Sequence, residues 1–181
     1  MILGHSNSGR EVKTMADLLT HALIGYTMGM LLSWRYKWVK PSYITMIMVG
    51  AVLPDVVRIR LLLDPILIET YLGIPFSWAP LHTLGGVLVS GLIITSLFES
   101  KMNKRIFLVV MIGALSHLVL DALLITASGH SYAVLWPFTY HRPIIPGLYL
   151  SSNVLPAVIS SITAAIVWRI DSYISPSQID D

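Results

Sequence analysis

The sequence has no cysteine and few charged side chains. Without cysteine it can form no disulfide framework, no thiolate metal site and no cysteine nucleophile. Charged residues make up only 12% of the 181 residues, against about 25% in an ordinary soluble domain. A soluble protein of this size needs more polar side chains than this to cover its surface. We therefore expect lipid to surround most of the chain.

The chain also lacks a concentrated basic region. Lys and Arg together number 12 and Asp and Glu number 10, which gives a formal net charge of +2. The basic residues lie in short runs between apolar segments, whereas a nucleic-acid binder clusters them with aromatic residues on one face. We therefore expect membrane lipid as a partner and no direct nucleic-acid binding. The sequence leaves the oligomeric state open.

Apolar sequence is abundant: 55% of the residues are hydrophobic and the mean hydropathy is +0.72. A membrane-spanning helix needs about 20 apolar residues, with a range of roughly 17 to 25. The pattern predicts an all-α integral membrane bundle of about five helices, within a range of four to six. The five apolar stretches are residues 18–34, 43–57, 84–98, 106–126 and 154–170. The second and third are short and must tilt or extend into flanking residues.

The remaining residues suggest the organisation and orientation of the chain. We expect a polar arm at residues 1–17, one transmembrane domain at 18–170 and a polar tail at 171–181. Two long proline-containing intervals, 58–83 and 127–153, should form outer loops that lie on or dip into the membrane surface. The side of the membrane with the long loops carries five basic residues, and the opposite side carries seven. The positive-inside rule therefore places the long loops outside the cytoplasm. The prediction is a multi-pass protein of the cell membrane.

Five polar residues within or beside the predicted spans are candidates for a shared site. His21 lies near the start of the first span and Asp55 near the end of the second. His82 precedes the third span, and His117 and Asp121 lie in the outer half of the fourth. Successive helices of an up-and-down bundle alternate in direction, so all five side chains should reach the same end of the bundle. That end carries the long loops, so we expect the site on the non-cytoplasmic side.

The segment Ser116-His117-x-x-x-Asp121 is the strongest local motif, because a four-residue spacing places two side chains on one helix face. A carboxylate in hydrocarbon costs several kcal/mol unless it is paired or bound. Imidazole and carboxylate ligands without thiolate favour zinc, manganese or iron at a catalytic site over structural zinc. A metal-activated water could attack an ester or phosphoryl group, and Asp55 is the candidate catalytic residue that takes its proton.

Glycines accompany the candidate ligands at four-residue intervals. Gly25 and Gly29 follow His21, and Gly113 precedes His117. Small residues on a ligand-bearing face let neighbouring helices approach closely, which short imidazole and carboxylate ligands require. We expect close helix contacts at these glycines.

Taken together, these motifs resemble the YdjM-like family over residues 15–138. The matching segments are Met15-Ala-Asp-Leu-Leu-Thr-His21-Ala-Leu-Ile-Gly25, Gly50-Ala-Val-Leu-Pro54-Asp55, Leu81-His82-Thr83, Ser116-His117-x-x-x-Asp121 and Leu135-Trp136-Pro137-Phe138. The resemblance implies an inner-membrane metal-dependent hydrolase, also described as LexA-binding, that is distantly similar to zinc-dependent phospholipase C and P1 nuclease. It implies one or two divalent transition-metal ions, with zinc favoured, and a phosphoester or phospholipid-type substrate. The implied metal ligands are His21, Asp55, His82, His117 and Asp121.

One segment departs from the family pattern, and three further residues have open roles. Many members carry His-Arg-Gly-x-Thr-His before the third span, whereas this chain has Ser77-Trp-Ala-Pro-Leu-His82 and lacks the first His and the Arg. A second metal or a phosphate contact is therefore in doubt. Trp136 is either an interfacial aromatic anchor or a wall of the site. His130 and His141 could supply extra ligands or a general acid.

Two other functions compete with the hydrolase. In a non-catalytic membrane scaffold or partner-binding protein, the polar residues would only tie helices together. In a bis-histidine haem protein, His21 and His117 would be the axial ligands. Haem ligation would leave Asp55 and Asp121 unexplained, so we rank it last.

Overall fold

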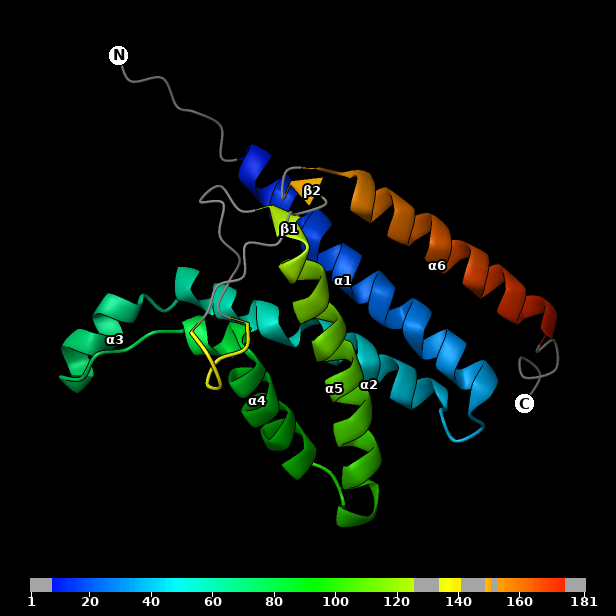
Figure 1. Cartoon of the computed structure of the whole chain (residues 1–181), viewed down its shortest axis with the longest axis horizontal. Helices are drawn as coiled ribbons and strands as arrows, with labels where there is room; N and C mark the ends of the chain where they lie inside the picture. The colour runs from blue at the N-terminus through cyan, green and yellow to red at the C-terminus, as the bar shows by residue number, and fades with distance from the viewer. Residues whose placement is uncertain (1–7, 126–133, 141–148, 151–152, 175–181) are drawn as a thin grey trace.

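The computed structural model describes residues 8–125, 134–140, 149–150 and 153–174 (Figure 1). The regular secondary structure of this part is helical apart from a short parallel pairing of β1 (Leu124–Ile125) with β2 (Tyr149–Leu150). The helices are α1 (Ser8–Arg35), α2 (Pro41–Val52), η1 (Leu53–Leu61), α3 (Pro65–Leu72), η2 (Ala79–His82), α4 (Leu84–Ser96), α5 (Ser100–Ala122) and α6 (Leu155–Ile174), where η marks a 3-10 helix. The predicted all-α membrane bundle of four to six helices is confirmed.

Three helical segments of the described chain are long and apolar enough to cross a membrane. They are Pro41–Ile59, which joins α2 to most of η1, Ser100–Ala122 and Leu155–Ile174. The third predicted stretch forms α4, which is apolar but has only 13 residues. The first predicted stretch is helical but is not among the three, because polar residues such as Thr20 and His21 interrupt its apolar sequence.

Two helix ends differ from the expected boundaries. Helix α1 begins at Ser8, so it occupies much of the predicted N-terminal arm. Helix α6 continues to Ile174, a few residues into the predicted polar tail. The division into one transmembrane domain with two polar ends stays a prediction.

Helix α5 packs against α2 and α4, α2 also packs against α1, and α6 lies along α1 (Figure 1). The main chains of α2 and α5 lie directly against each other at two glycines. A Cβ atom at Gly50 would lie 2.1 Å from the Val110 carbonyl oxygen, and one at Gly113 would lie 2.0 Å from that of Ile47. Only glycine fits at these two positions. The close approach that was predicted is confirmed for Gly25, Gly29 and Gly113.

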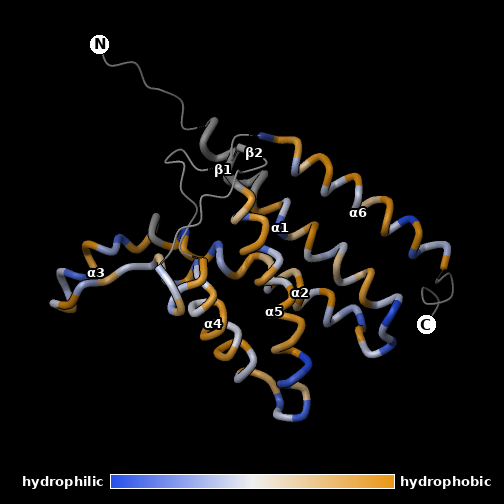
Figure 2. Tube along the Cα trace, in the orientation of Figure 1, coloured by the Kyte–Doolittle hydropathy of each residue, from blue (hydrophilic) through white to orange (hydrophobic). Residues whose placement is uncertain are grey.

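The outward face of the bundle is apolar. Val89 and Ile93 on α4, Val119 on α5 and Ile166 on α6 each expose more than half of their surface. The hydropathy colouring in Figure 2 shows apolar residues along these helices and hydrophilic ones at the turn between α4 and α5. A water-facing surface does not carry so many large apolar side chains, whereas a lipid-facing one requires them.

Candidate metal centre

Four of the five predicted site residues meet around one carboxyl group. Asp121 Oδ1 lies 3.2 Å from His21 Nε2, and Asp121 Oδ2 lies 2.7 Å from His82 Nε2 and 3.4 Å from His117 Nε2. The four residues come from α1, η2 and α5, and each is at most 9% exposed. The prediction that these side chains converge at one end of the bundle is correct for this set.

The ligand atoms of His21, His117 and Asp121 all lie within 4.8 Å of one another, so this buried group could hold a metal ion. The rings of His21 and His117 stack with centroids 3.7 Å apart and planes inclined by 23°. The His82 ring meets His117 edge to face at 5.1 Å. Two axial haem ligands must lie on opposite faces of a porphyrin, and the stacked rings leave no room for one between them. This geometry does not suit bis-histidine haem ligation.

Backbone carbonyls set the orientation of two of the imidazole rings. His117 Nδ1 lies 2.7 Å from the Ala51 carbonyl oxygen, and His82 Nδ1 lies 3.3 Å from that of Pro54. A carbonyl oxygen can only accept a hydrogen bond, so these contacts need a proton on Nδ1 of each ring. The Asp121 carboxylate also only accepts, so His82 needs a proton on Nε2 as well, which lies 2.7 Å from Oδ2. Each Nε2 therefore faces Asp121. Metal-binding histidines in proteins are commonly held in this way by a carbonyl on the opposite ring nitrogen.

These atoms can lie this close only if protons or a metal ion lie between them. An Nε2 lone pair, such as that of His117, and a carboxylate repel one another in a buried site unless a proton or a metal ion lies between them. Within the described residues, His117 Nε2 is buried and has no hydrogen-bond partner. Burial lowers the pKa of His82, but its hydrogen bond to Asp121 and the charge of that carboxylate outweigh burial and raise the pKa overall. The donor set and the orphaned nitrogen fit a metal ion that replaces such protons.

Pro54 helps to explain why the Ala51 carbonyl is available. At this point α2 passes into the 3-10 helix η1. In a 3-10 helix the carbonyl of residue 51 would accept from the N–H of residue 54, and Pro54 has no N–H to give. The Ala51 oxygen can therefore accept from His117. His82 ends η2, and Thr83 then starts α4 as its N-cap, because its Oγ1 accepts from Gly86 N at 3.2 Å.

Asp55 is buried in η1 but lies outside the group of mutually close ligand atoms. Its Oδ1 accepts a hydrogen bond from Arg58 Nε at 2.9 Å, and the Asp55 side chain is 7% exposed against 30% for Arg58. Its Oδ2 is buried and has no hydrogen-bond partner in the part of the chain that the structure describes. The role of Asp55 as a ligand or base stays a prediction. Arg58 was not predicted, although its three-residue spacing from Asp55 could have suggested the pair.

Trp136 is half-buried against the start of α4. Gly85 N donates to the Trp136 carbonyl oxygen at 2.9 Å, and Leu84 N donates to that of Val134 at 2.7 Å. This turn therefore lies beside the segment that follows His82, and a role for Trp136 as a wall of the site stays a prediction. The candidates His130 and His141 lie outside the described residues.

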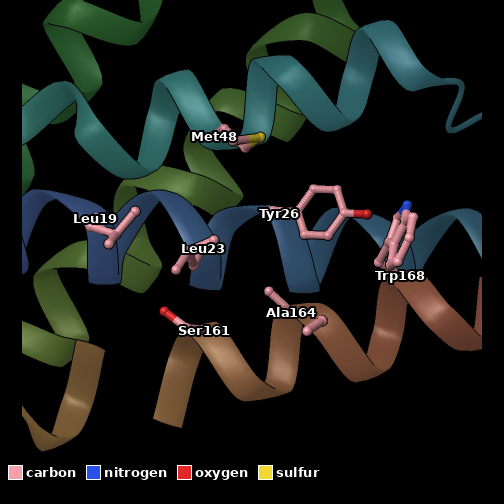
Figure 3. Close-up of a pocket in the computed structure, with 8 residues that line it drawn as sticks. Leu19, Leu23, Tyr26, Met48, Ser161, Ala164 and Trp168 are labelled. Atoms are coloured by element: carbon pink, nitrogen blue, oxygen red, sulfur yellow. The ribbon is translucent and has the colours of Figure 1, made fainter. Parts of the chain in front are cut away.

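A hollow with a volume of about 470 Å³ lies between α1, α2 and α6 (Figure 3). Leu19 and Leu23 line it, and His21 lies between them in the sequence. A two-residue step turns about 200° around a helix, so His21 points to the opposite side of α1. The hollow is therefore separate from the metal centre. Its lining is Leu19, Leu23, Tyr26, Met48, Ser161, Ala164, Ala165 and Trp168.

The comparison with known families agrees with this architecture. The family model described as YdjM inner membrane protein matches residues 15–175. The chain belongs to the YdjM inner membrane protein family. The match confirms the family resemblance and the membrane localisation, and it extends past residue 138 to include α6. No curated protein and no solved structure matches the chain.

Proposed function

We propose that this YdjM-family protein is a membrane-embedded metal-dependent hydrolase of a phosphoester or phospholipid-type substrate. The observation that carries the proposal is the convergence of three imidazole Nε2 atoms on the buried Asp121 carboxylate. Two of these rings are already oriented by backbone carbonyls, as metal ligands are. Hydrogen bonds that only tied helices together would not need to leave His117 Nε2 without a partner.

The donor set indicates the kind of metal. His21, His117 and Asp121 would hold the ion through nitrogen and oxygen donors without sulfur, and His82 would orient Asp121 through its hydrogen bond to Oδ2. Zinc accepts such ligands at catalytic sites, where three protein ligands leave a position open. A bound ion would supply Lewis-acid polarisation of the phosphoryl group and a water of lowered pKa.

Asp55 and Arg58 would supply the site with a base and a group that binds the substrate. Arg58 fixes Asp55 Oδ1, so Oδ2 is the oxygen that could accept a proton from an attacking water. The more exposed Arg58 guanidinium carries the charge and planar donors that suit a phosphoryl group. Arg58 could thereby replace the Arg that this chain lacks before α4.

Metal analysis of the detergent-purified protein tests the proposal. We expect one or two transition-metal ions per chain and hydrolysis of a generic phosphodiester such as bis(p-nitrophenyl) phosphate. His117→Ala should remove both, whereas Asp55→Asn should keep the metal and lose hydrolysis. Metal-free protein with undiminished hydrolysis would refute the proposal. Folded wild-type protein that binds no metal, together with stability loss in Asp121→Ala, would favour the scaffold.

A further inference from the structure

The chain between η1 and η2 forms a short helical arm that the metal centre does not use. We define the apolar arm as residues 62–74, which comprise α3 and its flanks. Asp64 Oδ1 accepts from Ile66 N at 2.9 Å, Pro65 occupies the first turn, and Gly73 ends the helix with φ of +67°. An Asp-Pro start and a left-handed glycine stop specify a helix locally. The arm is therefore a defined element.

The arm projects from the bundle (Figure 1), and most of its apolar side chains are exposed within the part of the chain that the structure describes. No residue of α3 is buried, although Figure 2 shows hydrophobic residues along it. Leu62, Ile66 and Tyr71 expose 85%, 70% and 87% of their surfaces. An apolar helix of this kind must be covered by an apolar environment. The other exposed apolar residues of the arm are Leu63, Leu67, Leu72 and Ile74.

The base of the arm is fixed to the chain that returns to the site. Trp78 Nε1 donates to the Leu63 carbonyl oxygen at 3.0 Å, and the rings of Phe76 and Trp78 meet edge to face at 4.8 Å. Tyr and Trp are enriched where membrane proteins meet the lipid head groups, and Tyr71 and Trp78 are of these types. The arm holds only two charged residues, Asp64 and Glu69. Its composition suits lipid.

We propose that the apolar arm lies in the lipid leaflet on the site's side of the membrane and that the site draws its substrate from that leaflet. The arm leaves the bundle after Asp55 and Arg58 and returns just before His82, so both of its ends adjoin candidate site residues. The substrate class is then a membrane lipid with a phosphoester head group in preference to a water-soluble phosphoester. This second half of the inference rests on the proposed hydrolase function, whereas the location of the arm does not.

Single-cysteine labelling tests the location of the arm. The sequence has no cysteine, so each variant carries one label. We would attach bimane at Leu67→Cys in liposomes and compare it with Lys37→Cys at an exposed turn and Ile166→Cys on a lipid-facing span. The Leu67 label should be quenched by spin-labelled lipid as at Ile166, and severalfold less by aqueous iodide than at Lys37. Iodide quenching equal to that at Lys37 would overturn the proposal.

A second copy of the chain is the other possible cover for the arm. In that case the label at Leu67→Cys would be shielded from both quenchers, and oxidation would link two chains through this cysteine. That result would also overturn the lipid location, because the arm would then be a dimer contact.

Activity measurements test whether the site draws a lipid substrate from the leaflet. Replacing Ile66 and Leu67 by Asn should reduce hydrolysis of phospholipid vesicles severalfold and leave hydrolysis of bis(p-nitrophenyl) phosphate unchanged. Tyr36→Asn, at an exposed turn on another part of the chain, should change neither rate. Equal losses on both substrates would refute the lipid-substrate half. If the wild-type protein hydrolyses neither substrate, the proposed function and the lipid-substrate inference are both refuted. The location of the arm is then still decided by the quenching experiment.

Discussion

Replacing Asp121 by Asn should abolish metal retention without unfolding the protein. The carboxylate faces His21 Nε2 at 3.2 Å, His82 Nε2 at 2.7 Å and His117 Nε2 at 3.4 Å. An amide of the same shape removes the negative charge, and its NH₂ group can donate to the imidazole lone pairs that a cation would otherwise satisfy. In this variant the amide's hydrogen bonds hold the three imidazole rings in place, so the rings need no metal ion between them.

The expected magnitude follows from the position of the carboxylate. Losing a partner that only orients a metal ligand costs about 10- to 100-fold in metal affinity. Asp121 lies among the ligand atoms themselves, so its loss should exceed about 100-fold, which corresponds to about 2.7 kcal/mol. Metal-free stability should stay equal or rise, because a buried charge is costly when its compensating cation is absent.

The assay is metal content per chain after dialysis against a graded series of chelators, together with thermal unfolding of the metal-free forms in detergent. Asp55→Asn is the matched control, since it makes the same chemical change at a buried carboxylate outside the close group. Wild-type metal retention in Asp121→Asn at every chelator strength would refute the assignment of this residue.

Three further predictions concern packing, metal linkage and ring orientation. Gly113→Ala should destabilise the protein by about 1–3 kcal/mol or more in thermal unfolding, because the new Cβ would meet a backbone oxygen at 2.0 Å. Gly91→Ala, where the Cβ would meet the flexible Met111 side chain at 3.2 Å, should cost less, and an equal cost would contradict the backbone contact. Chelation should lower the unfolding temperature of wild type, and zinc should restore it; no shift would argue against a metal bound to the folded state. His82→Gln should weaken metal retention by about 10- to 100-fold, which is less than the loss in Asp121→Asn. An equal loss in the two variants would contradict a role for His82 that is secondary to that of Asp121.

Residues with strong local constraints were predictable from the sequence. The four-residue spacing of His117 and Asp121 and the alternating direction of the helices were enough to place His21 and His82 at the same end. The glycine at position 113 indicated a close helix contact, which the structure confirms. Both inferences use only helical periodicity and the cost of burying polar groups in lipid.

Features that depend on tertiary contacts were not predictable. The sequence did not show that α2 passes into η1 at Leu53, because a periodic apolar pattern cannot distinguish a 3-10 helix from an α-helix. The sequence also did not show that Asp55 pairs with Arg58 and lies outside the close group, because both depend on how η1 packs in three dimensions. The length of the apolar stretches did not show that α3 stands apart from the bundle, because hydropathy does not report which neighbour covers a segment.

The carbonyl at Ala51 has a consequence for how this centre can be dissected. His117 depends on a main-chain atom, and a scan that truncates side chains to alanine leaves that atom in place and the residue itself unaltered. Such a scan would report position 51 as silent. Incorporating an α-hydroxy acid at position 52, which turns the amide into an ester and weakens the oxygen as an acceptor, would reveal the contribution directly.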